Sequence, residues 1–290
     1  MDPRIAELLP VIHSFGLDLP TIPEVRATFA KAAAEVPLPE GVSFSHAELA
    51  GMDALLVRAD GTQPARRILY FHGGGYIFGG IDAQKGMACR QALATGLEVV
   101  QPEYRLAPEH PCPAAIEDAV AAYQVLLDMD RPIAAIAGDS AGGGIALLAA
   151  IAIRDAGLHP PPAIVLYSPW VDIALTGPRY RARFHDVVLP RSLLDMARKA
   201  WLGGRAGDDP QASALYADLN ALPPTMIHVG GAELLLDDST RLAARLAEAE
   251  VEVSLTVRPN MIHVYPVYPS LAPEADDALA EVDAFLKHHG

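Results

Sequence analysis

Residues 133–150 read IAAIAGDSAGGGIALLAA, the most informative pattern in the chain. Its apolar start predicts a buried strand, and the small apolar residues at 143–153 predict a helix. Between them, GDSAG at 138–142 is a Gly-x-Ser-x-Gly pattern, which in this setting predicts a sharp turn with Ser140 at its tip. The Ser140 hydroxyl should point out of the sheet, and the Ala141 N–H at the helix start should face any negative charge that develops there.

The composition limits the classes of protein that this chain can be. It has 290 residues, is 51% hydrophobic and carries a net charge of −14 without a basic run, which argues against nucleic acid and anionic membrane surfaces as partners. The apolar stretch 145–153 is too short for a bilayer span, and the first residues do not form a signal peptide. Cys89 and Cys112 have no metal-ligand spacing. We therefore expect a cytoplasmic protein with two buried thiols, no metal and no membrane insertion.

Strand-like and helix-like segments alternate along most of the chain. Near-continuous Val, Ile and Leu runs in the strand-like segments indicate a buried, mostly parallel sheet flanked by helices, in the α/β class. The expected strands are residues 53–59, 67–71, 97–102, 133–137, 163–167, 225–229 and 253–257, and the expected helices are residues 83–95, 114–129, 143–153, 237–249 and 273–288.

Two regions interrupt this alternation. Residues 3–15 and 23–36 have helical spacing and precede the first expected strand, and a helix-like run at 191–202 lies in a connection that is too long for a plain crossover. Both could form a cap over the sheet, although the first two helices could equally be ordinary core packing. We expect N-terminal cap helices in residues 1–45 and a main domain in residues 46–290, with a cap insertion at about 172–210.

A serine hydroxyl at neutral pH needs a base, and the base needs an orienting acid. His263 follows the last expected strand in a short loop at the carboxyl edge of the sheet, and it follows Ser140 in the chain order serine, acid, histidine. We predict that His263 is the base. Glu233 lies in the loop after strand 225–229, whereas Asp237 suits a helix N-terminus. We predict Glu233 as the acid, with Asp237 as the alternative.

The run His72-Gly-Gly-Gly at 72–75 stands between a strand and a helix. Glycines there let the backbone turn N–H groups toward a developing oxyanion. The alternative is a flexible loop at a strand end. For the Ser140 stretch, the alternative is a glycine-rich helix N-terminus that holds a phosphate.

These motifs together resemble the hormone-sensitive-lipase family of α/β-hydrolases, chiefly its bacterial esterase members. In family order they are HGGGY at 72–76, YRLAPE at 104–109, GDSAG at 138–142, Gly230 with Glu233 and Asp237, and finally His263. The resemblance runs from about residue 66 to the C-terminus. It implies the α/β-hydrolase fold, carboxylester hydrolysis without a cofactor, and a cap built from the N-terminus and the insertion after the sixth strand.

The resemblance also implies roles for particular residues. It makes Gly74, Gly75 and Ala141 the donors of the oxyanion N–H groups, and a homodimer through the last strand (253–257) is common in the family. Tyr104, Arg105 and Glu109 look like braces of the site, or like loop structure only. The family's acid is usually the first residue of Asp-Pro-Leu-x-Asp, whereas this chain has Glu-Leu-Leu-Leu-Asp at 233–237.

The sequence thus predicts a serine carboxylesterase for small, short-acyl esters that works through Ser140, His263 and Glu233 and an acyl-enzyme. The alternatives are a hydrolase of amides or lactones with the same triad, and a non-catalytic protein that binds small molecules on the same fold. Four large side chains could line an acyl or alcohol pocket or simply belong to the cap core: Tyr76, Phe78, Met196 and Trp201.

Overall fold

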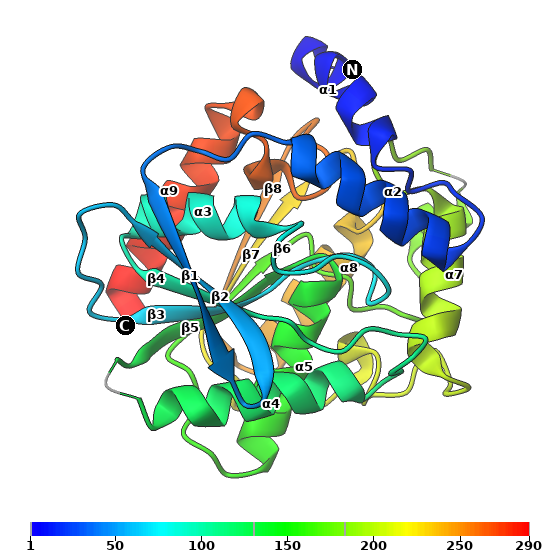
Figure 1. Cartoon of the computed structure of the whole chain (residues 1–290). Coiled ribbons are helices and arrows are strands. Elements are labelled where there is room, and N and C mark those ends of the chain that lie inside the picture. Colours follow the sequence, from blue (N-terminus) through cyan, green and yellow to red (C-terminus); the bar gives the residue numbers. More distant parts are fainter. Residues whose placement is uncertain (1, 130, 183, 290) are drawn as a thin grey trace.

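Within residues 2–129, 131–182 and 184–289, which the computed structural model describes, eight strands form one sheet in the order β1-β2-β4-β3-β5-β6-β7-β8 (Figure 1). β1 and β2 pair antiparallel with each other, and β2 pairs antiparallel with β4, whereas all other pairs are parallel. The strands are β1 (Val42–Leu49), β2 (Met52–Ala59), β3 (Arg67–Phe71), β4 (Glu98–Pro102), β5 (Ile133–Asp139), β6 (Ile164–Tyr167), β7 (Thr225–Gly230) and β8 (Val253–Arg258). The carboxyl ends of β3 through β8 therefore meet at one edge, as the sequence predicted.

Helices cover both faces of this sheet because neighbouring strand residues point to opposite sides. Leu69 of β3 and Ile136 of β5 pack in one core with α4, α5 and α8, while Ile68 and Ala135 pack in a second core with α3 and α9. The helices are α1 (Pro3–Ser14), α2 (Ile22–Glu35), α3 (Lys85–Thr95), α4 (Ala114–Leu127), α5 (Ala141–Asp155), α6 (Pro178–Arg181), α7 (Arg191–Leu202), α8 (Leu236–Glu248) and α9 (Glu274–His289). This arrangement confirms the expected α/β architecture.

β1 is absent from the strands that the sequence predicted. Six consecutive residues of this strand are exposed, so it lacks the alternation of buried and exposed positions that marks a half-buried strand. It forms because Ala50 and Gly51, both with positive φ (53° and 78°), make a two-residue hairpin that pairs it with β2.

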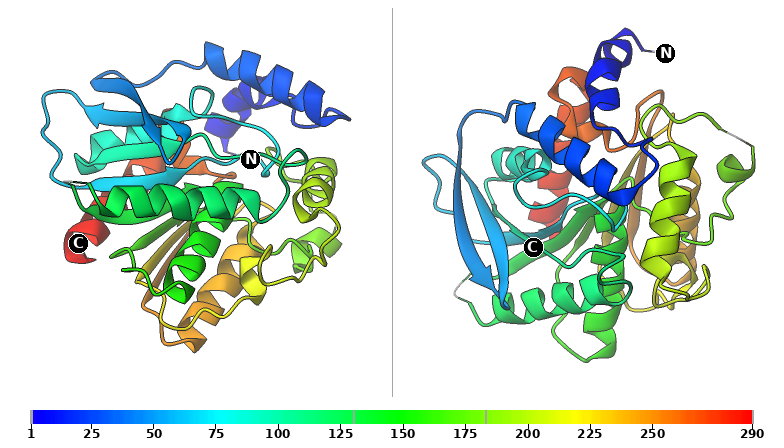
Figure 2. Two further views of the ribbon diagram at one scale, coloured as in Figure 1. Left: turned by 60° about the horizontal axis from the view of Figure 1, so that its bottom comes forward. Right: turned by 45° about the vertical axis from the view of Figure 1, so that its right-hand side comes forward.

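The two regions outside the alternation lie over the carboxyl edge of the sheet (Figures 1 and 2). α1 packs through Ile5 and Ile12 on residues that surround His263, such as Met261 and Ile262. α2 and α7 are adjacent to the glycine-rich loop after β3, as the contacts below show. Positions 1, 130, 183 and 290 lie outside the described residues. The structure describes all other residues of the expected domain ranges 1–45, 46–290 and 172–210.

Candidate active site

Ser140 sits at a sharp turn between β5 and α5. Its φ of 53° and ψ of −122° are strained for a residue with a side chain, and only 7% of its surface is exposed. The turn is held by hydrogen bonds from the Ser140 N–H to the Tyr167 carbonyl (2.9 Å) and from the Trp170 N–H to the Ser140 carbonyl (2.9 Å). A Cβ atom added to Gly142 would lie 2.0 Å from the Phe71 carbonyl oxygen, so only glycine allows α5 to approach β3 this closely.

The structure brings Glu233 and His263 together. The Nδ1 atom of His263 lies 3.1 Å from Oε1 of Glu233, and both side chains are buried. Because a carboxylate only accepts hydrogen bonds, this contact puts the proton of the neutral ring on Nδ1 and leaves Nε2 as the acceptor.

The charges around His263 favour its protonated form. Burial alone lowers the pKa of the imidazole, but the Glu233 carboxylate, with smaller contributions from Asp186 and Asp139, raises the pKa above its ordinary value. Asp139 is the residue before Ser140, so its influence on His263 reflects the meeting of the β5 and β8 loops at one edge of the sheet.

Asp237 makes different contacts from Glu233. It lies in the first turn of α8, whose N-cap residue is Leu235, so its place at a helix N-terminus agrees with the prediction from the sequence. Its carboxylate accepts a hydrogen bond from the N–H of Arg179 in α6 (2.6 Å). The same turn carries Asp238, which accepts from the N–H groups of Val171 and Asp172.

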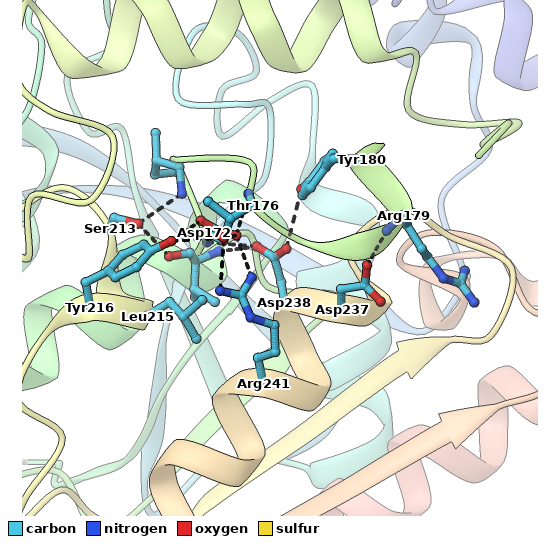
Figure 3. A network of polar contacts seen from close by, with 12 residues as sticks. Asp172, Thr176, Arg179, Tyr180, Ser213, Leu215, Tyr216, Asp237, Asp238 and Arg241 are labelled. Atoms are coloured by element: carbon cyan, nitrogen blue, oxygen red, sulfur yellow. Dashed lines mark hydrogen bonds and ion pairs between the residues drawn. The ribbon is translucent and has the colours of Figure 1, made fainter. Parts of the chain in front are cut away.

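Figure 3 shows how α8 is joined to the segment after β6. Asp172 accepts hydrogen bonds from the Thr176 hydroxyl (2.7 Å), the Tyr216 hydroxyl (2.9 Å) and the Arg241 guanidinium (2.6 Å). Burial and the Asp172 charge hold the pKa of the neighbouring Asp238 well above its ordinary range. This network joins the segment after β6 to the helix that follows the Glu233 loop.

Sequence reasoning missed Ser168, which connects the loop of Glu233 to the loop of His263. Its hydroxyl donates to Oε2 of Glu233 (2.8 Å) and accepts from the N–H of Val264 (3.0 Å), the residue after His263. The Gly230 N–H also donates to Oε2 of Glu233 (2.9 Å). Ser168 directly follows β6 in a buried Ser-Pro-Trp run, and no local pattern indicates that its hydroxyl faces loops 65 and 96 residues away.

The glycine-rich loop after β3 lies against the Ser140 turn. Gly74 and Gly75 have positive φ (111° and 58°), and the Gly73 N–H donates to the Asp139 carboxylate (3.0 Å), which also accepts from the Tyr70 hydroxyl. Burial raises the pKa of Asp139. A carboxylate held beside Ser140 therefore fixes the backbone of this loop.

The expected braces divide into two groups. The Tyr104 hydroxyl donates to the His72 carbonyl (2.7 Å), and its ring stacks on the His72 imidazole, so Tyr104 supports the glycine-rich loop directly. Arg105 instead binds Asp118 of α4 (2.9 Å). Glu109 pairs with Arg26 of the N-terminal helix α2, which lowers the pKa of the Glu109 carboxyl to about 2.

The large side chains around this loop pack against α2 and α7. The Tyr76 ring stacks on Trp201 of α7 with ring centres 4.1 Å apart, and Phe78 packs on Phe29 of α2 at 4.8 Å. Tyr76 and Trp201 are almost fully buried, which favours the cap-core interpretation for both, whereas Met196 is only partly buried. The two helices α2 and α7 thus contact residues two positions apart in one loop.

A strained serine turn after a buried parallel strand, with a histidine–carboxylate pair at the same sheet edge, is typical of an α/β-hydrolase. The family model described as the alpha/beta hydrolase fold matches residues 68–267. An acetyl-hydrolase of Streptomyces hygroscopicus is 38% identical over 228 residues, which are 78% of this chain and 76% of that protein. The carboxylesterase NlhH of Mycobacterium tuberculosis is 34% identical over 76% of this chain and 72% of its own length.

Solved structures agree with these relatives. An esterase from the bacterial hormone-sensitive lipase family has a TM-score of 0.92 at 34% identity, and the match covers 100% of this chain and 99% of that one. A hormone-sensitive lipase from a metagenome library has a TM-score of 0.90 at 35% identity, with 100% and 99% coverage. The chain belongs to the hormone-sensitive-lipase family of α/β-hydrolases, as its motifs predicted.

Proposed function

We propose that this chain is a serine carboxylesterase that hydrolyses small, short-acyl esters through an acyl-enzyme. The observation that carries the proposal is the strained Ser140 turn together with the 3.1 Å contact between Nδ1 of His263 and Glu233. The names of the relatives, which are esterases, a carboxylesterase and an acetyl-hydrolase, support the same reaction class.

In the proposed reaction, Oγ of Ser140 attacks the ester carbonyl carbon while Nε2 of His263 takes its proton. Glu233 holds the ring in the tautomer that leaves Nε2 free to accept, and its charge stabilises the imidazolium that forms. Nε2 then returns the proton to the leaving alcohol. Water repeats the sequence on the acyl-enzyme and releases the carboxylic acid.

We assign the N–H groups of Gly74, Gly75 and Ala141 to the oxyanion. Ala141 begins α5, where the helix dipole favours negative charge, and the positive φ angles of Gly74 and Gly75 suit a backbone turned out of its regular course. Each such donor is worth about 3–4 kcal/mol of the activation barrier.

The short-acyl preference and the assembly belong to the same proposal. The acetyl-hydrolase relative and the close approach of α7 to the glycine-rich loop, where a Cβ on Gly75 would meet Ala197 at 3.2 Å, support a short acyl group. β8 is the last strand at one edge of the sheet and exposes 38% of Val257, which supports a homodimer through that edge. Cys89 and Cys112 are buried free thiols, which fits a reducing cytoplasm.

The length and hydropathy of the helices also bear on whether the chain could cross a membrane. Among the described residues, no helix has both the length and the hydropathy that crossing a bilayer requires. The division into cap segments 1–45 and 172–210 and a catalytic domain 46–290 remains part of the proposal.

The test is hydrolysis of p-nitrophenyl butyrate by Ser140→Ala, with Ser45→Ala on the exposed strand β1 as the matched control. p-Nitrophenyl butyrate is suitable because crystals of a structural neighbour, EstE5, were soaked in it. We expect Ser140→Ala to lose at least about 1,000-fold in kcat and Ser45→Ala to match the parent chain. Turnover by Ser140→Ala at more than a tenth of the parent rate would refute the assignment.

A further inference from the structure

A side chain from the cap insertion forms hydrogen bonds with the loop that carries Glu233. The guanidinium of Arg179 in α6 donates through Nη1 to the Glu233 carbonyl (2.6 Å) and through Nη2 to the Gly231 carbonyl (3.1 Å). The backbone N–H of Arg179 binds Asp237 at the far end of the same loop, as Figure 3 shows. A planar fork that spans two carbonyls fixes the loop more closely than a single donor would.

A second cap residue holds the next position of the loop. The N–H of Leu234 donates to Oδ2 of Asp186 (2.7 Å), while Oδ1 accepts from the N–H groups of Val188 (2.8 Å) and Leu189 (3.0 Å) in its own segment. Asp186 is only 6% exposed. Its two oxygens thus tie the backbone of the cap insertion to the residue after Glu233.

The hydrogen bond between Leu234 and Asp186 depends on the local sequence. In the Asp-Pro-Leu-x-Asp pattern a proline follows the acid, and proline has no N–H to donate. This chain has Leu234 at that position and a glutamate before it. Because the longer acid has one more rotatable bond to immobilise, a firmly held backbone reduces what is lost in orienting it.

We propose that Arg179 and Asp186 are positioning residues for the acid–base pair, so that Glu233 is oriented toward His263 only while the cap insertion is docked on the acid loop. This inference rests on the proposed function for the roles of Glu233 and His263. Neither Arg179 nor Asp186 is proposed to touch the substrate. Their action is on the backbone on both sides of Glu233.

Asp186 has an additional electrostatic action. The charged groups whose fields reach His263 are Glu233, Asp186 and Asp139, and all three raise the pKa of the imidazole against the opposite effect of burial. Tyr268, whose pKa is raised by burial and by Asp186 and Asp139, is neutral in the same surroundings. The two positioning residues should therefore differ in one measurable respect, because Arg179 acts through geometry alone.

Two variants separate these actions. Asp186→Asn has one acceptor oxygen in place of two, so its amide NH₂ must face N–H donors on one side, and the negative charge is lost. Arg179→Lys keeps the positive charge but cannot span two carbonyls. Asp195→Asn is the matched control, because this exposed carboxylate lies on α7 and makes a long, 3.9 Å contact with Arg191.

With p-nitrophenyl butyrate, we expect both positioning variants to lose about 10- to 100-fold in kcat, because small displacements of reacting groups cost that much, with KM little changed. Asp186→Asn should also lower the apparent pKa of the acid limb of kcat/KM, while Arg179→Lys leaves it in place. Asp195→Asn should match the parent in all three quantities.

Titration of the His263 ring by NMR gives a readout that needs no hydrolysis. A lowered His263 pKa in Asp186→Asn, with the parent value in Asp195→Asn, supports the proposal even if the parent chain hydrolyses no ester, in which case only the proposed function fails. Parent kcat in folded Arg179→Lys, or an unchanged His263 pKa and kcat in folded Asp186→Asn, overturns the proposal. Should Asp186→Asn not fold, Arg179→Lys decides alone.

Discussion

Replacing Glu233 by glutamine tests the acid–base pair at the level of single hydrogen bonds. Oε2 of Glu233 accepts from the Ser168 hydroxyl (2.8 Å) and the Gly230 N–H (2.9 Å), and Oε1 accepts from Nδ1 of His263 (3.1 Å). Glutamine has one oxygen and one NH₂ group. The oxygen is needed where two donors converge, so the NH₂ group of Glu233→Gln must face His263.

An NH₂ group facing Nδ1 of His263 reverses the tautomer. Nδ1 then accepts, the proton moves to Nε2, and the ring can no longer take the proton of Ser140. The corresponding carboxylate-to-amide change in a serine protease triad lowers kcat by about 10⁴ while the geometry stays intact. That factor corresponds to about 5.5 kcal/mol in the activation free energy.

The assay is steady-state hydrolysis of p-nitrophenyl butyrate at a pH where His263 of the parent is neutral. Glu248→Gln, an exposed change on α8, is the matched control and should keep the parent rate. Thermal unfolding of both variants shows whether the fold is intact. If folded Glu233→Gln keeps more than a tenth of the parent kcat, Glu233 does not orient the base and the reasoning from its hydrogen bonds is wrong.

Three further predictions concern the surroundings of this pair. Since the pKa of His263 is raised above 6.5 and the base must be neutral, kcat/KM should fall as pH drops through a value above 6.5; a pH–rate profile that stays flat to pH 5 would contradict this. Gly142→Ala should give no folded, active protein, because the new Cβ would lie 2.0 Å from the Phe71 carbonyl; expression with parent-like circular dichroism and activity would refute the close approach. Ser168→Ala removes a hydrogen bond to a buried carboxylate and leaves the Val264 N–H unpaired, so the free energy of unfolding should fall by about 3 kcal/mol. Denaturant unfolding measures this loss, and ester hydrolysis should show a drop in kcat.

The sequence indicated the fold and the location of the site through local patterns. The strand–turn–helix pattern around Ser140 and the alternating apolar runs were sufficient for the parallel sheet and its carboxyl edge. The sequence points to His263 and Glu233 because each follows a strand that ends at that edge, and the structure brings their side chains into contact. The catalytic roles of these residues remain predictions.

The structural features that the sequence did not predict depend on contacts between distant parts of the chain, which local patterns do not contain. Six consecutive residues of β1 are exposed, so this strand shows no alternation of buried and exposed positions. Ser168, Arg179 and Asp186 reach the acid loop only because the chain folds back over itself, and each could equally be a surface or loop residue in the sequence. Asp237 lies in the first turn of its helix, as the sequence predicts, but its hydrogen bond from the backbone N–H of Arg179 in α6 joins segments that are far apart in the chain.

The most direct test of the central claim is covalent labelling by a p-nitrophenyl alkylphosphonate, which reacts with a serine whose proton a neighbouring base can take. Intact-protein mass spectrometry should show one adduct per chain, peptide mapping should locate it on Ser140, and esterase activity should disappear in parallel. An unlabelled folded chain, or an adduct on another residue with Ser140 untouched, would contradict the account.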